Sequence, residues 1–242
     1  MKILGVIPSR YASTRFPGKP LVEIAGKTMI RRVYERASES KSLHAVVVAT
    51  DDERIAEEVK RFGGNYVLTS SAHQSGTDRC AEVASHYEGY DVVINIQGDE
   101  PFIDPAQIDL VAQCFTDASV QLATLIKQIV NDDELFNPNI PKVVLDRSGA
   151  AIYFSRQPIP YLRNAEERQW LQQQAYYKHI GIYGYTVAAL KEITSLEPSS
   201  LELAESLEQL RWVENGYRIQ TAITTIETIA IDTPDDLLKI SL

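Results

Sequence analysis

Short apolar runs alternate with helical patterns in the first half of the chain, and this alternation constrains the fold most. Four runs are rich in β-branched residues and nearly continuous: KILGVIP (2–8), HAVVVAT (44–50), NYVLT (65–69) and DVVINI (91–96). Runs of this kind are typical of strands in a mainly parallel sheet that is covered on both faces. Parallel strands need long crossover connections, which are usually helices. The pattern therefore predicts an α/β fold with a doubly wound, mainly parallel sheet.

The segments between the runs repeat apolar residues at helical spacing. We expect helices over residues 29–40, 52–62, 77–87 and 105–115. In doubly wound sheets, ligands bind beyond the carboxyl ends of the strands. Each loop that follows one of these strands is therefore a candidate site.

After about residue 120 the pattern becomes that of antiparallel strands. Residues 121–129, 141–146 and 150–156 are strand-like, and the sequence Asp-Arg-Ser-Gly at 146–149 is typical of a hairpin turn. Residues 157–176 are polar and are expected to be mobile. We expect a single domain over residues 1–242, with an antiparallel insertion at approximately 121–180.

The last part of the chain returns to a mixed pattern. Residues 177–185 and 217–223 alternate as strands, and 231–237 is typical of a turn followed by a helix. Residues 199–215 predict one helix. Its inward stripe would be Leu203, Leu207, Leu210 and Val213.

Composition and charge limit the setting and the partners. Cys80 and Cys114 lie far apart and lack metal-ligand spacing, which fits a reducing cytoplasm. We find no signal-peptide pattern and no apolar stretch near the ~20 residues that span a bilayer, so membrane insertion is not expected. The formal net charge of −9 disfavours a nucleic-acid partner.

The loop after the first run is basic although the whole chain is acidic. It reads IPSRYASTRFPGK (7–19) and carries Arg10, Arg15 and Lys19, while residues 1–22 contain no Asp or Glu. This segment could be an ordinary surface loop with solvated basic side chains, or it could bind an anion. The lack of a neutralising acid favours a cradle for a small anion such as a triphosphate.

This loop does not match either common nucleotide-binding motif. A Walker A sequence is G-x-x-x-x-G-K-[ST], but Ser13 stands at the first glycine position and Pro20 follows Lys19. A Rossmann G-x-G-x-x-G is also absent. The sequence therefore disfavours a P-loop ATPase and a dinucleotide-dependent enzyme.

Two aspartates that follow strands are candidate metal ligands. Asp99 lies in QGDEP, at the carboxyl end of the run 91–96. Mg²⁺ commonly binds one or two carboxylates together with substrate phosphates. Asp232 follows the apolar stretch TIAI and precedes Thr-Pro, so its alternative role is a helix N-cap. The residue pattern alone leaves both roles open for Asp232.

The segment SRYASTRFPGKPL closely resembles the signature of the 3-deoxy-D-manno-octulosonate (Kdo) cytidylyltransferase family. The resemblance continues in order over nearly the whole chain, and the combination is specific although each block alone is weak. The blocks are VATDDERI (48–55), SGTDR (75–79), INIQGDEP (94–101), KVVLD (142–146), YFSR (153–156), HIGIYGY (179–185), LEQLR (207–211) and DTPDDL (232–237). The departures are small: Ser9 replaces a common Ala, and Ala230-Ile231 replaces a usual Gly-Val.

The resemblance implies a nucleotidyltransferase fold of the GT-A-like type and a defined reaction. CMP would pass from CTP to the anomeric hydroxyl of Kdo, giving CMP-Kdo and pyrophosphate for lipopolysaccharide synthesis. It implies a Mg²⁺ cofactor held by Asp99 and Asp232, a cytoplasmic location and a homodimer assembled through the insertion. The catalytic set would be these two aspartates with Arg10, Arg15 and Lys19. The nucleotide ligands would be Arg10, Ser13, Arg15, Lys19, Arg79 and Gln97.

The resemblance also implies a site for the acidic sugar. Its residues would be Arg156, His179, Tyr183, Glu208 and Gln209. An Arg side chain suits bidentate binding of the Kdo carboxylate. Without the resemblance, Arg156 is an ordinary strand-end residue, His179 is structural, and Glu208 pairs with Arg211 on one helix face.

Three rival functions are distinguishable by sequence or assay. A cytidylyltransferase for the 8-amino analogue of Kdo would share nearly every motif. A sugar-1-phosphate nucleotidylyltransferase usually begins with a Gly-rich G-x-G-x-R loop, which this chain lacks. A non-catalytic nucleotide sensor would not need the sugar-side residues, so their joint presence counts against it.

Overall fold

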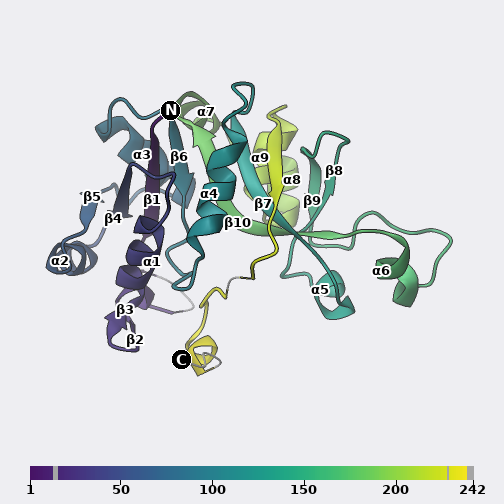
Figure 1. The fold of residues 1–242 in the computed structure, drawn as a ribbon, viewed down its shortest axis with the longest axis horizontal. Helices are drawn as coiled ribbons and strands as arrows, with labels where there is room; N and C mark the ends of the chain where they lie inside the picture. The colour runs from purple at the N-terminus through teal and green to yellow at the C-terminus, as the bar shows by residue number, and fades with distance from the viewer. Residues whose placement is uncertain (13–15, 228, 239–242) are drawn as a thin grey trace.

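The computed structural model has a central sheet with helices on both faces and an arm that projects at one end (Figure 1). The structure describes residues 1–12, 16–227 and 229–238. Within them, one nine-stranded sheet has the main order β11-β7-β10-β6-β1-β4-β5, with β8 and β9 attached beside β10. The predicted doubly wound α/β fold is confirmed.

All four apolar runs of the first half form parallel strands in the middle and at one edge of this sheet. β1 pairs in parallel with both β4 and β6, and β4 pairs in parallel with β5. The carboxyl ends of these strands therefore meet along one edge. Their bounds are β1 (Ile3–Ser9), β4 (Ala45–Thr50), β5 (Asn65–Leu68) and β6 (Val92–Asn95).

Two layers of helices cover the two faces of the sheet, and each face has its own apolar core. One layer consists of α1 (Met29–Ser38), α2 (Glu53–Arg61) and α4 (Pro105–Cys114). The other consists of α3 (Gly76–His86), α7 (Val187–Ile193) and α9 (Gln209–Glu214). Helical periodicity predicted the four helices of the first half to within a few residues at each end.

Strands of the second half extend the same sheet. β10 (Tyr177–Thr186) is antiparallel to both β6 and β7 (Leu122–Gln128), whereas β11 (Ile219–Ile223) is parallel to β7. β8 (Lys142–Leu145) and β9 (Ala151–Ser155) form the hairpin that the turn sequence predicts. β7 is thus a strand of the central sheet, and the chain leaves the sheet only after it.

The projecting arm carries α5 (Asp132–Phe136), η2 (Glu167–Gln169) and α6 (Trp170–Gln173) (Figure 1). Its stretch 157–176 was expected as a polar, mobile segment, but in the structure it contains helical turns with a small core of their own. Trp170 and Tyr176 are buried there with Ile129 and Leu135. The two aromatic side chains bury a large apolar area, and this packing is not apparent from the polar composition of the stretch.

The prediction of one helix over 199–215 is wrong. The segment forms α8 (Ser200–Glu205) and α9, separated at Ser206, whose φ of 51° is left-handed. Leu203, expected in the inward stripe, is 69% exposed. The cause is tertiary, because Arg156 donates from Nε to the carbonyl of Glu205 (2.6 Å) and from Nη2 to that of Ser206 (3.2 Å).

Short elements complete the chain around the basic loop and near its end. They are η1 (Lys19–Leu21), β2 (Glu23–Ile24), β3 (Lys27–Thr28) and α10 (Pro234–Leu238). None of the helices in the described residues has the length and apolar character needed to cross a membrane.

Candidate active site

A cavity of about 250 Å³ lies at the carboxyl ends of the parallel strands. Its walls come from the loop after β1, the start of η1, the segment from before α3 into its first turns, and the loop after β6. The cavity brings together five of the predicted site residues that lie far apart in the sequence. The lining residues are Pro8, Ser9, Arg10, Lys19, Pro20, His73, Gln74, Ser75, Gly76, Arg79, Gln97, Gly98 and Asp99.

Gly98 allows two of these loops to approach each other. A Cβ atom at this position would lie 2.7 Å from the carbonyl oxygen of Pro8. Non-bonded carbon and oxygen atoms do not come so close without a shift of the backbone. Gly98 therefore keeps Asp99 beside the end of β1.

Lys19 lies between the two aspartates that the sequence singles out. Its Nζ is 2.8 Å from Oδ2 of Asp99 and 3.5 Å from Oδ1 of Asp232. The backbone N–H of Ile231 donates to the carbonyl of Asp99 at 2.9 Å, which holds the two segments together. Two carboxylates that are far apart in the sequence thus converge on one cationic group.

This pair of carboxylates fits the chemistry of a magnesium site. Mg²⁺ prefers hard oxygen ligands and commonly takes one or two carboxylates, completing its shell with phosphates and water. Asp236 accepts the hydrogen bonds from the backbone N–H groups of Asp232 and Thr233 before α10. Among the residues that the structure describes, no three His, Cys, Asp or Glu side chains are grouped to hold a metal ion.

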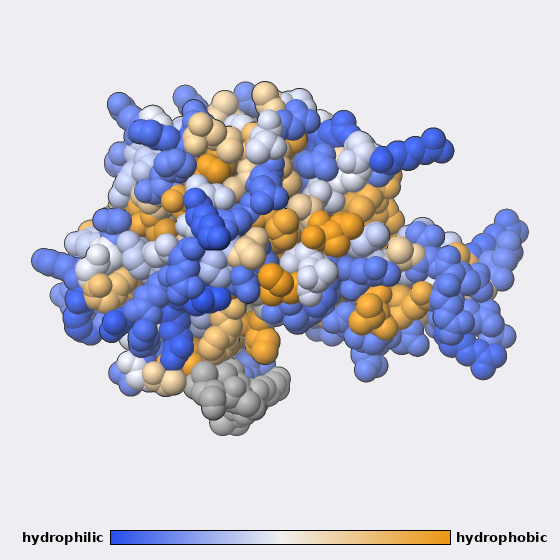
Figure 2. Space-filling model, viewed as in Figure 1, coloured by the Kyte–Doolittle hydropathy of each residue, from blue (hydrophilic) through white to orange (hydrophobic). Residues whose placement is uncertain are grey.

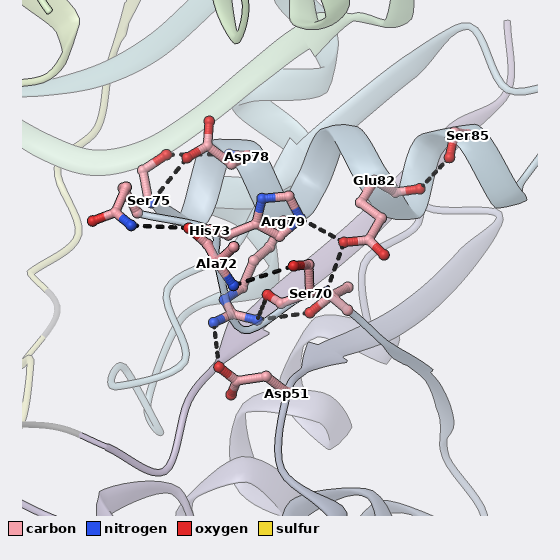
Figure 3. A network of polar contacts seen from close by, with 11 residues as sticks. Asp51, Ser70, Ala72, His73, Ser75, Asp78, Arg79, Glu82 and Ser85 are labelled. Carbon is pink, nitrogen blue, oxygen red and sulfur yellow. Dashed lines mark hydrogen bonds and ion pairs between the residues drawn. The ribbon is translucent and has the colours of Figure 1, made fainter.

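Two further predicted nucleotide ligands help to shape the cavity. Arg79 is buried, and its guanidinium donates to Asp51 (2.7 Å) and to Thr69 Oγ1 (2.7 Å), as Figure 3 shows in part. Gln97 donates from Nε2 to the carbonyl of Gly181 at 2.7 Å and so ties the end of β6 to β10. The predicted ligands Ser13 and Arg15 lie outside the described residues.

Asp51 is a residue whose role the sequence did not indicate. Its neighbour Asp52 caps α2 by accepting from the N–H of Arg54. Asp51 instead forms the ion pair with Arg79. No sequence spacing signals this contact, because the two residues come from different crossover units.

Arg156, which is predicted to bind the sugar, is held by backbone carbonyls. Besides those of Glu205 and Ser206, its Nη1 donates to the carbonyl of Pro138 at 2.9 Å. Arg156 therefore joins the base of the arm to the break between α8 and α9. It is not among the residues that line the cavity.

His179 and Tyr183 lie in an aromatic cluster on β10. The imidazole packs against Phe154 and Tyr183, with ring centroids 5.3 and 5.1 Å apart, and its Nε2 lies 2.9 Å from Thr124 Oγ1. Burial lowers the pKa of His179 to about 3, so the ring is neutral at physiological pH. Burial also raises the pKa of the Tyr183 hydroxyl well above its ordinary value.

Glu208, one of the predicted sugar ligands, contacts α3, the helix that carries the predicted nucleotide ligand Arg79. Its carboxylate accepts a hydrogen bond from Thr77 Oγ1 at 3.0 Å, in the first turn of α3. Burial raises the pKa of Glu208, although hydrogen bonds from Ser75 and Thr77 oppose this. Arg211, its expected helix partner, forms its ion pair with Glu202 instead. The neighbouring Gln209 is buried at the start of α9.

Sequence reasoning missed the cavity wall made by residues 73–76. The sequence did contain a sign of where this wall ends and α3 begins. Ser75 and Asp78 form a capping box, so α3 begins at Gly76, one residue before the predicted start. His73 and Gln74 carry no such local pattern, and only the sheet topology brings them to the cavity.

Comparison with known proteins identifies the family. A sequence profile described as cytidylyltransferase matches residues 4–223. The 3-deoxy-manno-octulosonate cytidylyltransferase of Parabacteroides distasonis is 58% identical over 99% of this chain and 96% of its own length. The enzyme of that name from Cytophaga hutchinsonii is 56% identical over 100% of this chain and 97% of its own.

A solved structure agrees with these relatives. It is that of a CMP:2-keto-3-deoxy-manno-octonic acid synthetase complexed with CTP, with a TM-score of 0.92 and 43% sequence identity. The match covers 99% of this chain and 96% of the other. The chain therefore belongs to the cytidylyltransferase family and, within it, to the 3-deoxy-manno-octulosonate cytidylyltransferases.

Proposed function

We propose that this protein transfers CMP from CTP to the anomeric hydroxyl of Kdo, releasing pyrophosphate and giving CMP-Kdo. The observation that carries the proposal is the cavity lined by Arg10, Lys19 and Asp99, where Lys19 also contacts Asp232. This arrangement suits a triphosphate whose terminal part leaves. The names of the relatives and the CTP complex of the structural neighbour support the two substrates.

The residues of the cavity would act mainly by positioning and by neutralising charge, as is usual in transfers at phosphorus. Arg10 and Lys19 would bind the β- and γ-phosphates and stabilise the leaving pyrophosphate. Arg15 and Ser13 complete the predicted phosphate cradle. Gln97 and Arg79 would bind or shape the nucleoside end.

Asp99 and Asp232 are the proposed magnesium ligands. A bound Mg²⁺ supplies charge neutralisation at the phosphates and lowers the pKa of a coordinated hydroxyl. The aspartates would orient the substrate phosphates against Arg10 and Lys19. We propose no separate general base.

For the sugar we propose Arg156, His179, Tyr183, Glu208 and Gln209. The neutral imidazole of His179 suits hydroxyl groups, since it offers one donor and one acceptor. The contacts of Arg156 with three carbonyls would hold the α8–α9 break in place, and its guanidinium keeps further N–H donors for the Kdo carboxylate. The link from Glu208 to Thr77 would couple sugar binding to the nucleotide side.

We further propose a homodimer that works in the cytoplasm and serves lipopolysaccharide synthesis. Exposed apolar side chains on and near the arm support an interface there: Val130 (77% exposed), Phe136 (37%) and Tyr161 (73%). Figure 2 shows apolar surface in this region beside strongly hydrophilic surface. Both cysteines are free thiols, which fits a reducing compartment.

The experiment is to identify the product. The protein is incubated with Mg²⁺, CTP and either Kdo or its 8-amino analogue, and the sugar nucleotide is detected by mass spectrometry. Formation of CMP-Kdo at a rate well above that of the 8-amino product is expected. Formation of the 8-amino product alone would show that the 8-amino analogue, and not Kdo, is the substrate. Nucleotide binding without either product would favour a nucleotide sensor.

A further inference from the structure

The loop between β5 and α3, residues 69–75, forms a cavity wall on the side away from Asp99. The strand order is β6-β1-β4-β5, Asp99 follows β6, and this loop follows β5. If the triphosphate lies at Lys19 and Asp99, as proposed above, the base of the nucleotide points toward the loop. His73, Gln74 and Ser75 line the cavity there.

α3 holds this loop through two side chains one turn apart. Arg79 donates to Thr69 Oγ1 and to the carbonyl of Ser70, at 2.7 and 3.3 Å. Glu82 accepts with one oxygen, Oε2, from the backbone N–H of Ser70 at 2.9 Å and lies 2.5 Å from Nε2 of His73. Figure 3 shows both side chains reaching from the helix to the loop.

The contact with Glu82 decides which nitrogen of His73 carries the proton. Burial raises the pKa of Glu82, but the hydrogen bonds from Ser70 and His73 outweigh it and leave the pKa below its ordinary value. The carboxylate is therefore ionised at neutral pH and only accepts hydrogen bonds. In a neutral imidazole, Nε2 is then the donor and Nδ1 keeps a lone pair.

We infer that His73 determines the choice of pyrimidine, with Nδ1 accepting a hydrogen bond from the 4-amino group of cytosine, and that Glu82 is the positioning residue that fixes this tautomer. Uracil presents a carbonyl oxygen at the same place, so two acceptors would face each other. A site built around one such hydrogen bond rejects the mismatched analogue strongly. This inference rests on CTP being the nucleotide.

The test is the ratio of the dissociation constants of UTP and CTP, measured by calorimetry at mildly alkaline pH. His73→Leu is expected to weaken CTP binding about tenfold or more and to leave UTP binding nearly unchanged, so that the ratio collapses. Glu82→Gln is expected to lower the ratio too. Its amide can donate to Nε2 and allow the proton to move to Nδ1, which then suits uracil.

Two control variants make the same chemical changes on the exposed part of the same region. His86→Leu and Glu88→Gln should keep the ratio of the unchanged protein, because neither residue lines the cavity. Thermal melting of all four variants shows whether they are folded. A merely structural role of the pair would weaken CTP and UTP binding equally.

An unchanged UTP-to-CTP ratio in folded His73→Leu would overturn the inference, as would a parallel loss of both nucleotides. The proposed function fails by a different result, namely no CMP-Kdo from CTP and Kdo with the unchanged protein. Because the ratio is measured without sugar and without turnover, the two failures are distinguishable.

Discussion

At the scale of single residues, Lys19 lies between two carboxylates that are far apart in the sequence. The sequence made Lys19 part of a phosphate cradle and left Asp232 open between a cap and a metal ligand. The structure brings the carboxylates of Asp99 and Asp232 to one ammonium group. That contact could not be read from the sequence, since the residues are 133 positions apart.

Asp99→Asn should reduce turnover far more than stability. The amide keeps the shape of the side chain but removes a charge that the proposed Mg²⁺ site needs, so kcat should fall about 100-fold or more. The ion pair with Lys19 is partly exposed and is worth roughly 0–1 kcal/mol. Steady-state rates with Mg²⁺ and a thermal melt check both expectations. Near-normal turnover would show that the metal assignment is wrong.

His179 should make the free energy of unfolding depend on pH. Its pKa is about 3 in the folded protein and about 6.5 in an unfolded chain. As pH falls from about 6.5 to about 3, the unfolded chain takes up a proton that the folded protein does not, so stability falls through this window. When the pH falls from 7 to 5, the free energy of unfolding of His179→Gln should decrease by about 1–2 kcal/mol less than that of the unchanged protein. Urea unfolding at the two pH values measures this, and equal losses would contradict the burial of a neutral imidazole.

At the scale of elements, glycine at the end of β6 is as important as the charged residues around it. Gly98→Ala should cost about 1–3 kcal/mol and weaken CTP binding, because a Cβ would meet the carbonyl of Pro8 at 2.7 Å. Gly181→Ala is the matched control, since its nearest neighbour would be Gln97 Cγ at 3.9 Å. Urea unfolding and calorimetry compare the two variants. Equal effects would mean that the close approach of the loops is not required.

Periodicity predicted most elements, and it failed where tertiary contacts override it. Apolar runs and helical spacing identified the strands and helices of the first half, because each buries its apolar face in a regular layer. The break between α8 and α9 at Ser206 was not predicted, because it is stabilised by Arg156, which follows β9 and is distant in the sequence. The wall with His73 escaped as well, because the strand order and not the local sequence brings it to the cavity.

At the scale of the whole molecule, the arm should form the dimer interface. Tyr161 is exposed, and its ring packs on Trp170. Tyr161→Asp replaces this aromatic side chain with a charged one and should shift the protein from dimer to monomer. Leu203→Asp is the control, since Leu203 is 69% exposed but lies on α8, outside the arm. Sedimentation velocity measures the change. A monomeric unchanged protein would contradict the proposed dimer. A dimer that survives in the Tyr161 variant would show that the interface lies elsewhere.

The basic loop, the two aspartates and the arm belong to one cytidylyltransferase. We expect the cavity at the strand ends to transfer CMP to an acidic sugar. The most direct measurement is pyrophosphate release by the purified protein with Mg²⁺. We predict release that requires both CTP and Kdo and that falls about 100-fold or more in Asp99→Asn. Binding of CTP without any release in the presence of Kdo would contradict the claim.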